Sequence, residues 1–133
     1  RNPLDQVLSI IREDFASRNA YSSNVECVAE MLVLYYDMLS FVEKNGCMDN
    51  VIEYDYDKVV LDPEVELRKI TEGLGWTWDR KYLEPDQSER SVATASVNQA
   101  RKPISTKSLQ GWRNYQDLLE PARKIFDQHS IAY

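Results

Sequence analysis

The spacing of apolar residues between Val25 and Lys44 constrains the fold more than any other feature of this sequence. They recur at intervals of three and four, which is typical of an amphipathic helix. The recurring residues are Val25, Val28, Leu32, Tyr35, Leu39 and Val42. Ser23-x-x-Glu26 has the pattern of a capping box, and Asn45-Gly46 supplies a stop. The sequence therefore predicts a long helix over 25–44, packed against a core.

Further helices follow from start signals and apolar spacing. Asn2-Pro3 predicts a helix over 3–16, and Asp62-Pro63 opens another that ends at Gly73 or Gly75. The remaining expected helical pieces are a short turn within 76–83, a short helix at 112–118 and a last helix that restarts at Glu120-Pro121.

The best strand candidate is 51–56, which combines β-branched and aromatic residues. One strand cannot form a sheet alone. Two interpretations stay open: an all-α fold with one extended segment, or a strand whose partners lie outside this chain.

The charge distribution singles out one region. The chain of 133 residues has a net charge of −6, which argues against nucleic acid as a partner. From Arg90 to Tyr115, however, basic residues occur and acidic residues do not. Such a stretch favours a site for an anion, with a solvated basic loop as the alternative.

Other site classes have little support. Cys27 and Cys47 lack a metal-like or redox spacing, which predicts buried or half-buried thiols in a reducing, cytoplasmic compartment. His129 is the single histidine, which argues against a zinc site or a Ser-His-Asp triad within the chain. No apolar run is long enough to span a membrane, and the first residues are unlike a signal peptide.

The first motif is Arg1-Asn2-Pro3-x-Asp5-x-x-x-Ser9. It resembles the 3′-phosphate motif of sulfotransferases that use 3′-phosphoadenosine-5′-phosphosulfate (PAPS). The resemblance implies that Arg1 and Ser9 bind the 3′-phosphate. An arginine fork and a helix N-terminus both favour phosphate. The alternative is an ordinary capped helix with a surface arginine.

Tyr56-Asp57-Lys58 through Asp62-Pro63 resembles a second segment of that family, in which a strand end leads into a helix. The resemblance implies that Tyr56 flanks the adenine. Asp57 and Lys58 depart from the Glu-Asp pair of the family. A core tyrosine at a strand end is the alternative.

The third motif runs from Val92 to Ile104 and continues as Ser108-x-x-x-Trp112-Arg113-x-Tyr115. It resembles a signature of bacterial sulfotransferases related to the protein-tyrosine enzymes. The resemblance implies that Ser96, with Arg101 or Lys102, closes over the phosphates of the nucleotide, and that Trp112 anchors the returning helix. This is also the acid-free stretch.

Together these motifs imply the C-terminal part of a P-loop-type α/β sulfotransferase fold, with residues 1–133 as a single, partial domain that is mainly α with one or two short strands. The intact enzyme would transfer a sulfuryl group from PAPS to an acceptor hydroxyl. The sequence lacks the glycine-rich phosphosulfate loop and an evident catalytic base, so we expect nucleotide binding without catalysis from this chain alone.

Three alternatives remain at this stage: a binding fragment of the enzyme, a helical protein-interaction module without a nucleotide site, and a split enzyme with its loop on a second chain. Losing part of a sheet would expose apolar helix faces, which predicts self-association. The acceptor is left open.

Overall fold

The computed structural model describes residues 1–13, 19–47, 51–87 and 102–133. The described chain is mainly helical and divides into two compact units. Unit 1 contains Arg1–Val51 and Leu109–Tyr133, and unit 2 contains Ile52–Ser108. The prediction of a mainly α chain is confirmed. The single-domain assignment and the P-loop-type fold remain predictions.

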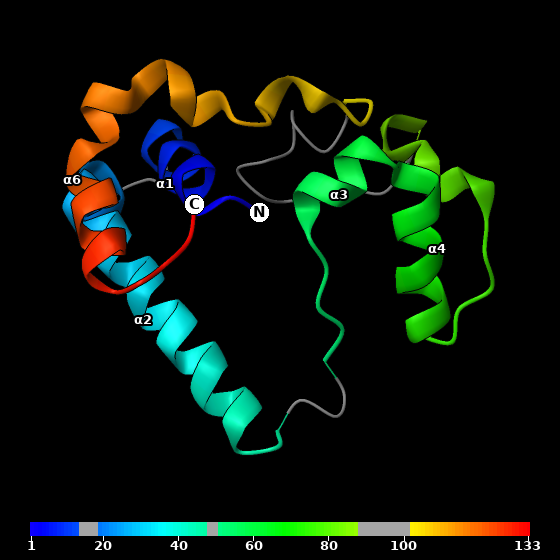
Figure 1. Ribbon diagram of the computed structural model, residues 1–133. Coiled ribbons are helices and arrows are strands. Elements are labelled where there is room, and N and C mark those ends of the chain that lie inside the picture. The colour runs from blue at the N-terminus through cyan, green and yellow to red at the C-terminus, as the bar shows by residue number, and fades with distance from the viewer. Residues whose placement is uncertain (14–18, 48–50, 88–101) are drawn as a thin grey trace. The chain divides into compact units, whose positions relative to one another are not determined.

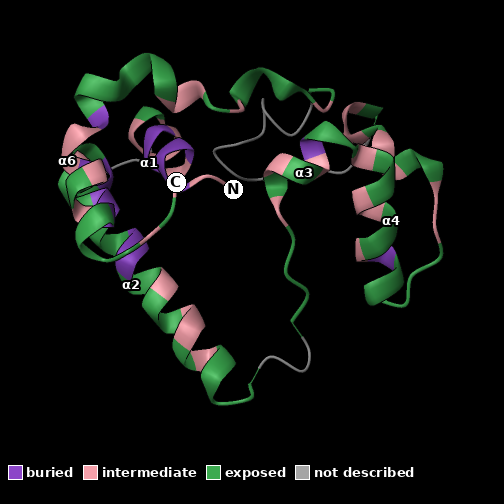
Figure 2. Ribbon diagram, viewed as in Figure 1, coloured by how far each residue is buried: buried purple, intermediate pink, exposed green. Residues whose placement is uncertain are grey.

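Unit 1 is built on three α-helices, α1 (Pro3–Arg12), α2 (Val25–Lys44) and α6 (Gln116–Gln128), which contact one another pairwise (Figure 1). Two 3₁₀ helices, η2 (Ala20–Ser23) and η6 (Gly111–Tyr115), lead into α2 and α6. Their buried apolar residues form one core (Figure 2). The members of this core are Leu4, Val7, Leu8, Val28, Ala29, Leu32, Val33, Leu119, Ala122 and Phe126.

Helix α1 begins where its sequence predicts. The Asn2 side chain accepts hydrogen bonds from the N–H groups of Leu4 and Asp5, and Pro3 occupies the first helical position. The helix ends at Arg12, four residues before the predicted end. Residues 14–16 of the prediction lie outside the described residues.

Helix α2 has the predicted bounds, but the capping residue differs. Asn24, not Ser23, accepts from the N–H of Cys27, while the Ser23 hydroxyl donates to the carbonyl of Ala20. The predicted capping box, with Ser23 as the N-cap, is therefore wrong, and the N-cap lies one residue later at Asn24. The reason is that η2 runs to Ser23, so the first residue with extended backbone before α2 is Asn24. Gly46, with φ +68°, follows the helix as expected.

Helix α6 starts earlier than predicted. It begins at Gln116, and Pro121 lies inside it in place of restarting it. Pro121 lacks the N–H that would bond the carbonyl four residues before, which is that of Asp117 in the first turn. The missing bond is thus close to the N-terminus, where few intrahelical bonds have yet formed.

Unit 2 contains α3 (Tyr56–Leu61), α4 (Pro63–Gly73) and the 3₁₀ helices η3 (Arg80–Leu83), η4 (Pro85–Gln87) and η5 (Thr106–Ser108). The predicted strand at 51–56 is wrong. Residues 51–55 have no regular structure, and Tyr56 already belongs to α3. None of the described residues forms a strand, so this segment has no ladder to join. The Asp55 side chain caps α3 instead.

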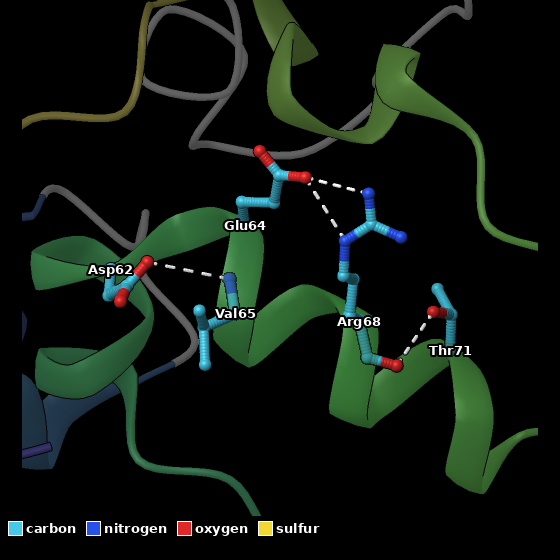
Figure 3. Close-up of polar contacts among 5 residues, drawn as sticks. All are labelled: Asp62, Glu64, Val65, Arg68 and Thr71. Atoms are coloured by element: carbon cyan, nitrogen blue, oxygen red, sulfur yellow. Dashed lines mark hydrogen bonds and ion pairs between the residues drawn. The ribbon is translucent and has the colours of Figure 1, made fainter.

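Local polar contacts organise α4 (Figure 3). Asp62 accepts from the N–H of Val65 at its start, and Glu64 pairs with Arg68 one turn later at 2.7 Å. Arg68 also lies over the Trp78 ring, 4.3 Å from its centroid. At the other end a Cβ on Gly73 would stand 3.0 Å from the Ile52 side chain, so glycine permits this close approach.

None of the described helices is long and apolar enough to cross a membrane.

Candidate functional site

The start of α1 holds Arg1 by its backbone. The Gln6 amide donates to the carbonyl of Arg1 and to the hydroxyl of Tyr36, at 2.9 Å in both cases. Tyr36 lies on α2, so this one amide ties the residue before the N-cap to a second helix. Burial raises the pKa of Tyr36 above its ordinary value, because burial disfavours the charged phenolate. The arginine backbone is thereby fixed at the mouth of α1, where a phosphate-binding side chain is expected.

The first-turn N–H groups of α1 are already used. Pro3 has none, Leu4 and Asp5 donate to the Asn2 side chain, and Gln6 donates to the Asn2 carbonyl at 3.1 Å. The N–H groups at these positions are therefore not open to a phosphate. Side chains and the positive end of the helix dipole are what this end can offer an anion.

Ser9 lies two turns into α1 and is half-buried. It follows Asp5 by four residues, so the two share one helix face. At 1.5 Å per residue its Cα lies roughly 9 Å along the axis from that of Pro3.

Asp5 connects the first motif to the end of the third. It is 2% exposed, and its two carboxylate oxygens accept from the backbone N–H groups of Gln110 (2.8 Å) and Trp112 (2.9 Å). Hydrogen bonds to a buried carboxylate are stronger than neutral ones. The two segments are more than a hundred residues apart in sequence, and one side chain brings them together.

The segment held by Asp5 has an unusual backbone. Gln110 has φ 53°, the left-handed region, and it directly precedes η6. Its N–H points at a buried carboxylate, which offsets the cost of this conformation. Trp112 then packs on the core of unit 1, with its ring edge-on to Tyr133 at 6.2 Å between centroids. Trp112 thus anchors the chain where it enters α6.

The other predicted site residues are distributed differently. Tyr56 is the first residue of α3 and is 36% exposed, and Lys102 is exposed in the described part of unit 2. Ser96 and Arg101 lie outside the described residues. Unit 1 therefore contains Arg1, Ser9 and the Gln110–Trp112 segment, which Asp5 contacts, while Tyr56 and Lys102 belong to unit 2.

A comparison with known families decides the class. The profile described as "Sulfotransferase family" matches residues 1–80, which is more than half of the chain. The chain belongs to the sulfotransferase family. The matched residues contain the first two motifs, and the third motif follows them.

One curated relative of this sulfotransferase chain is an uncharacterised protein of Aquifex aeolicus (strain VF5). It is 28% identical over 131 residues, which cover 96% of this chain and 17% of the relative. The chain therefore spans about a sixth of the length of that protein. No solved structure matches significantly.

Two parts of the site were missed by sequence reasoning. The first is the role of Asp5. Its position among the apolar residues Leu4, Val7 and Leu8 could have indicated that it is buried. Such a residue is buried only with partners. The second is the Gln6–Tyr36 contact, which carries no local pattern because it joins two helices.

In the part of the chain that the structure describes, no three His, Cys, Asp or Glu residues form a group that could hold a metal ion. Cys27 and Cys47 are free and exposed, so the prediction that they are buried or half-buried is wrong. Cys27 lies on the outer side of α2 and Cys47 just beyond its end, which explains their exposure.

Proposed function

We propose that this sulfotransferase chain binds the nucleotide end of PAPS for transfer of a sulfuryl group to an acceptor hydroxyl. In this proposal Arg1 and Ser9 bind the 3′-phosphate, and Tyr56 flanks the adenine. Ser96, with Arg101 or Lys102, closes over the phosphates. A cytoplasmic location is part of the same proposal.

The observation that carries the proposal is the Asp5 contact. The proposal needs the 3′-phosphate motif and the acid-free stretch at one site. Asp5 holds the end of that stretch against α1, one turn before Ser9. Arg113, whose guanidinium lies 5.2 Å from the Trp112 ring centroid, adds a basic residue to the same segment.

The chemical roles assigned to these residues are binding and positioning. A guanidinium provides paired donors that match phosphate oxygens, and a hydroxyl adds a neutral donor. Sulfuryl transfer also needs a base for the acceptor and positive charge at the leaving oxygen. The sequence has no glycine-rich phosphosulfate loop, so we assign no catalytic residue to this chain.

The test is a thermal shift with the product 3′,5′-adenosine bisphosphate. At tenfold excess over its dissociation constant a ligand raises the free energy of unfolding by about 1.4 kcal/mol. We expect a rise in Tm with the bisphosphate and a smaller rise with 5′-adenosine monophosphate, which lacks the 3′-phosphate.

Variants at both ends of α1 make the test specific. Arg1→Ala should abolish the difference between the two nucleotides. Arg12→Ala removes an exposed arginine at the opposite end of the same helix and should preserve it. Equal losses in both variants, or no shift with a folded chain, would contradict the nucleotide site. A folded chain that does not bind nucleotide but does bind a protein would instead support the alternative of a protein-interaction module.

A further inference from the structure

Helix α2 carries an apolar stripe on its outer surface between Met31 and Phe41. We define the α2 stripe as five residues whose exposed fractions are Met31 44%, Leu34 62%, Tyr35 47%, Met38 53% and Phe41 67%. The residues of α2 that enter the core are Val28, Ala29, Leu32 and Val33. At 3.6 residues per turn the two sets point roughly 150° apart around the helix axis. In the C-terminal half of α2, Figure 2 shows intermediate and exposed residues only.

The exposed apolar area of the α2 stripe indicates that a partner covers it. A helix that is apolar on both faces is normally buried on both. With about 200 Å² for a fully exposed side chain of this size, the exposed fractions leave roughly 500 Å² of surface on the stripe. Contiguous apolar patches of this size on soluble proteins mark interaction sites.

The spacing of the stripe is compatible with a second copy of the same helix as the partner. Met31, Leu34, Met38 and Phe41 are separated by three, four and three residues, an order that is the same in both directions. Two such stripes therefore match when the helices run antiparallel about a two-fold axis. Met31 then faces Phe41 of the second copy, and Leu34 faces Met38. Tyr35 meets its equivalent beside the axis, and aromatic pairs of this kind are favourable.

The flanking charges fit the same register. Glu30, Asp37 and Lys44 lie along one edge of the stripe and are exposed. The antiparallel register places Glu30 near Lys44 of the second copy, twice by symmetry. It also brings the two Asp37 side chains together, a repulsion that solvent weakens at an exposed edge. Two complementary pairs outnumber this one like-charge pair.

We propose that the α2 stripe is a self-association surface on which a second copy of this chain packs its own α2 antiparallel. The two copies together bury roughly 1,000 Å², the lower limit for a specific interface. An interface of this size belongs to the weak, transient class, so we expect a reversible dimer. This inference does not depend on the proposed nucleotide site.

Sedimentation velocity over a concentration series tests the surface. The chain should shift from monomer to dimer as its concentration rises. Met38→Lys places a charge at the centre of the stripe and should weaken association at least about tenfold. Leu61→Lys, at a residue 67% exposed on α3, is the matched control and should leave it unchanged. Circular dichroism verifies that both variants fold.

A charge exchange tests the register. Lys44→Glu should weaken the dimer because it places a second carboxylate beside Glu30 of the other copy. Adding Glu30→Lys in the same chain should restore it. A monomer at every concentration, equal effects of Met38→Lys and Leu61→Lys, or no rescue by the double exchange would overturn the proposal.

Cysteine cross-linking tests the direction. In a chain with Cys27→Ser and Cys47→Ser, the single variants Leu34→Cys and Met38→Cys should form cross-linked dimers when mixed. Each variant alone should cross-link poorly. Efficient cross-linking of Leu34→Cys with itself would indicate parallel helices and overturn the antiparallel arrangement.

Discussion

Unit 1 and unit 2 bury very different amounts of apolar surface. Ten buried apolar residues from α1, α2 and α6 form the core of unit 1. In the described part of unit 2, Val60 is the buried apolar residue. Unit 2 also exposes large apolar side chains, among them Tyr54, Leu61, Val65 and Trp76.

This difference indicates that the two units are stabilised by different forces. Unit 1 has the apolar burial that dominates folding free energy. The contacts that unit 2 has in its described part are largely local and polar: Glu64 with Arg68, Glu66 with Lys69, and the Arg68–Trp78 stacking. Exposed ion pairs contribute little. Unit 1 should therefore set the measured stability of the chain.

Truncation of a core residue tests this comparison with the largest expected effect. Phe126 is fully buried, so Phe126→Ala should lower the free energy of unfolding by about 3–5 kcal/mol. Leu61→Ala in unit 2 removes an exposed side chain and should change it by about 0.5 kcal/mol or less. Urea unfolding followed by circular dichroism compares the two. Similar losses of unfolding free energy in the two variants would contradict the conclusion that unit 1 sets the measured stability.

Removal of the Asp5 carboxylate should have the next largest effect. Asp5→Ala leaves the N–H groups of Gln110 and Trp112 without their buried acceptor, which should cost about 2–3 kcal/mol. Asp5→Asn keeps one acceptor oxygen and should cost less. Asp37→Ala, on the exposed side of α2, is the matched control, measured at low concentration. Stability equal to that of the unaltered chain would show that Asp5 does not hold η6.

The two helix caps allow a finer comparison between units. Asn24→Ala removes the cap of α2, whose bond to Cys27 N–H is 2.9 Å, and should cost about 1 kcal/mol. Asp62→Ala removes the longer 3.4 Å bond at the start of α4 and should cost less in urea unfolding. A larger cost for Asp62→Ala would place more of the measured stability in unit 2 than its burial indicates.

The ion pair of α4 should have the smallest effect. Glu64 and Arg68 are both about half exposed, so Glu64→Gln should cost about 0.3–0.5 kcal/mol at low salt. Added salt should reduce the difference. A salt-independent loss above that range would mean that Arg68 depends on Glu64 for its position over Trp78.

The sequence predicts those elements whose signals are local, and it fails where an element depends on distant residues. Helix α2 and the starts of α1 and α4 follow from apolar spacing and from Asn or Asp beside proline, which are local signals. The β-branched and aromatic residues of 51–56 predict a strand, but a strand depends on neighbours that local sequence does not specify. Pro121 predicts a helix boundary, although η6 and the first turn of α6 have already begun the helix before it.

The site shows the same limit. Arg1, Ser9 and Tyr56 are identified by motif, and the family match covers those motifs. The buried contact between Asp5 and the Gln110–Trp112 backbone joins residues at opposite ends of the chain, so no window of sequence contains it. Likewise, the side of α2 that faces the core depends on where α1 and α6 lie, and Tyr35 proved to be on the outer side.

The discontinuity of unit 1 affects how the protein is made. Its two segments are separated by Ile52–Ser108, so α1 and α2 leave the ribosome well before α6. At roughly 5–20 residues per second, several seconds pass before Phe126 and the Gln110 N–H become available to them. During that interval the nascent chain presents both sides of α2 to its surroundings. Translation pauses within unit 2 would lengthen this exposure and increase demand for chaperones.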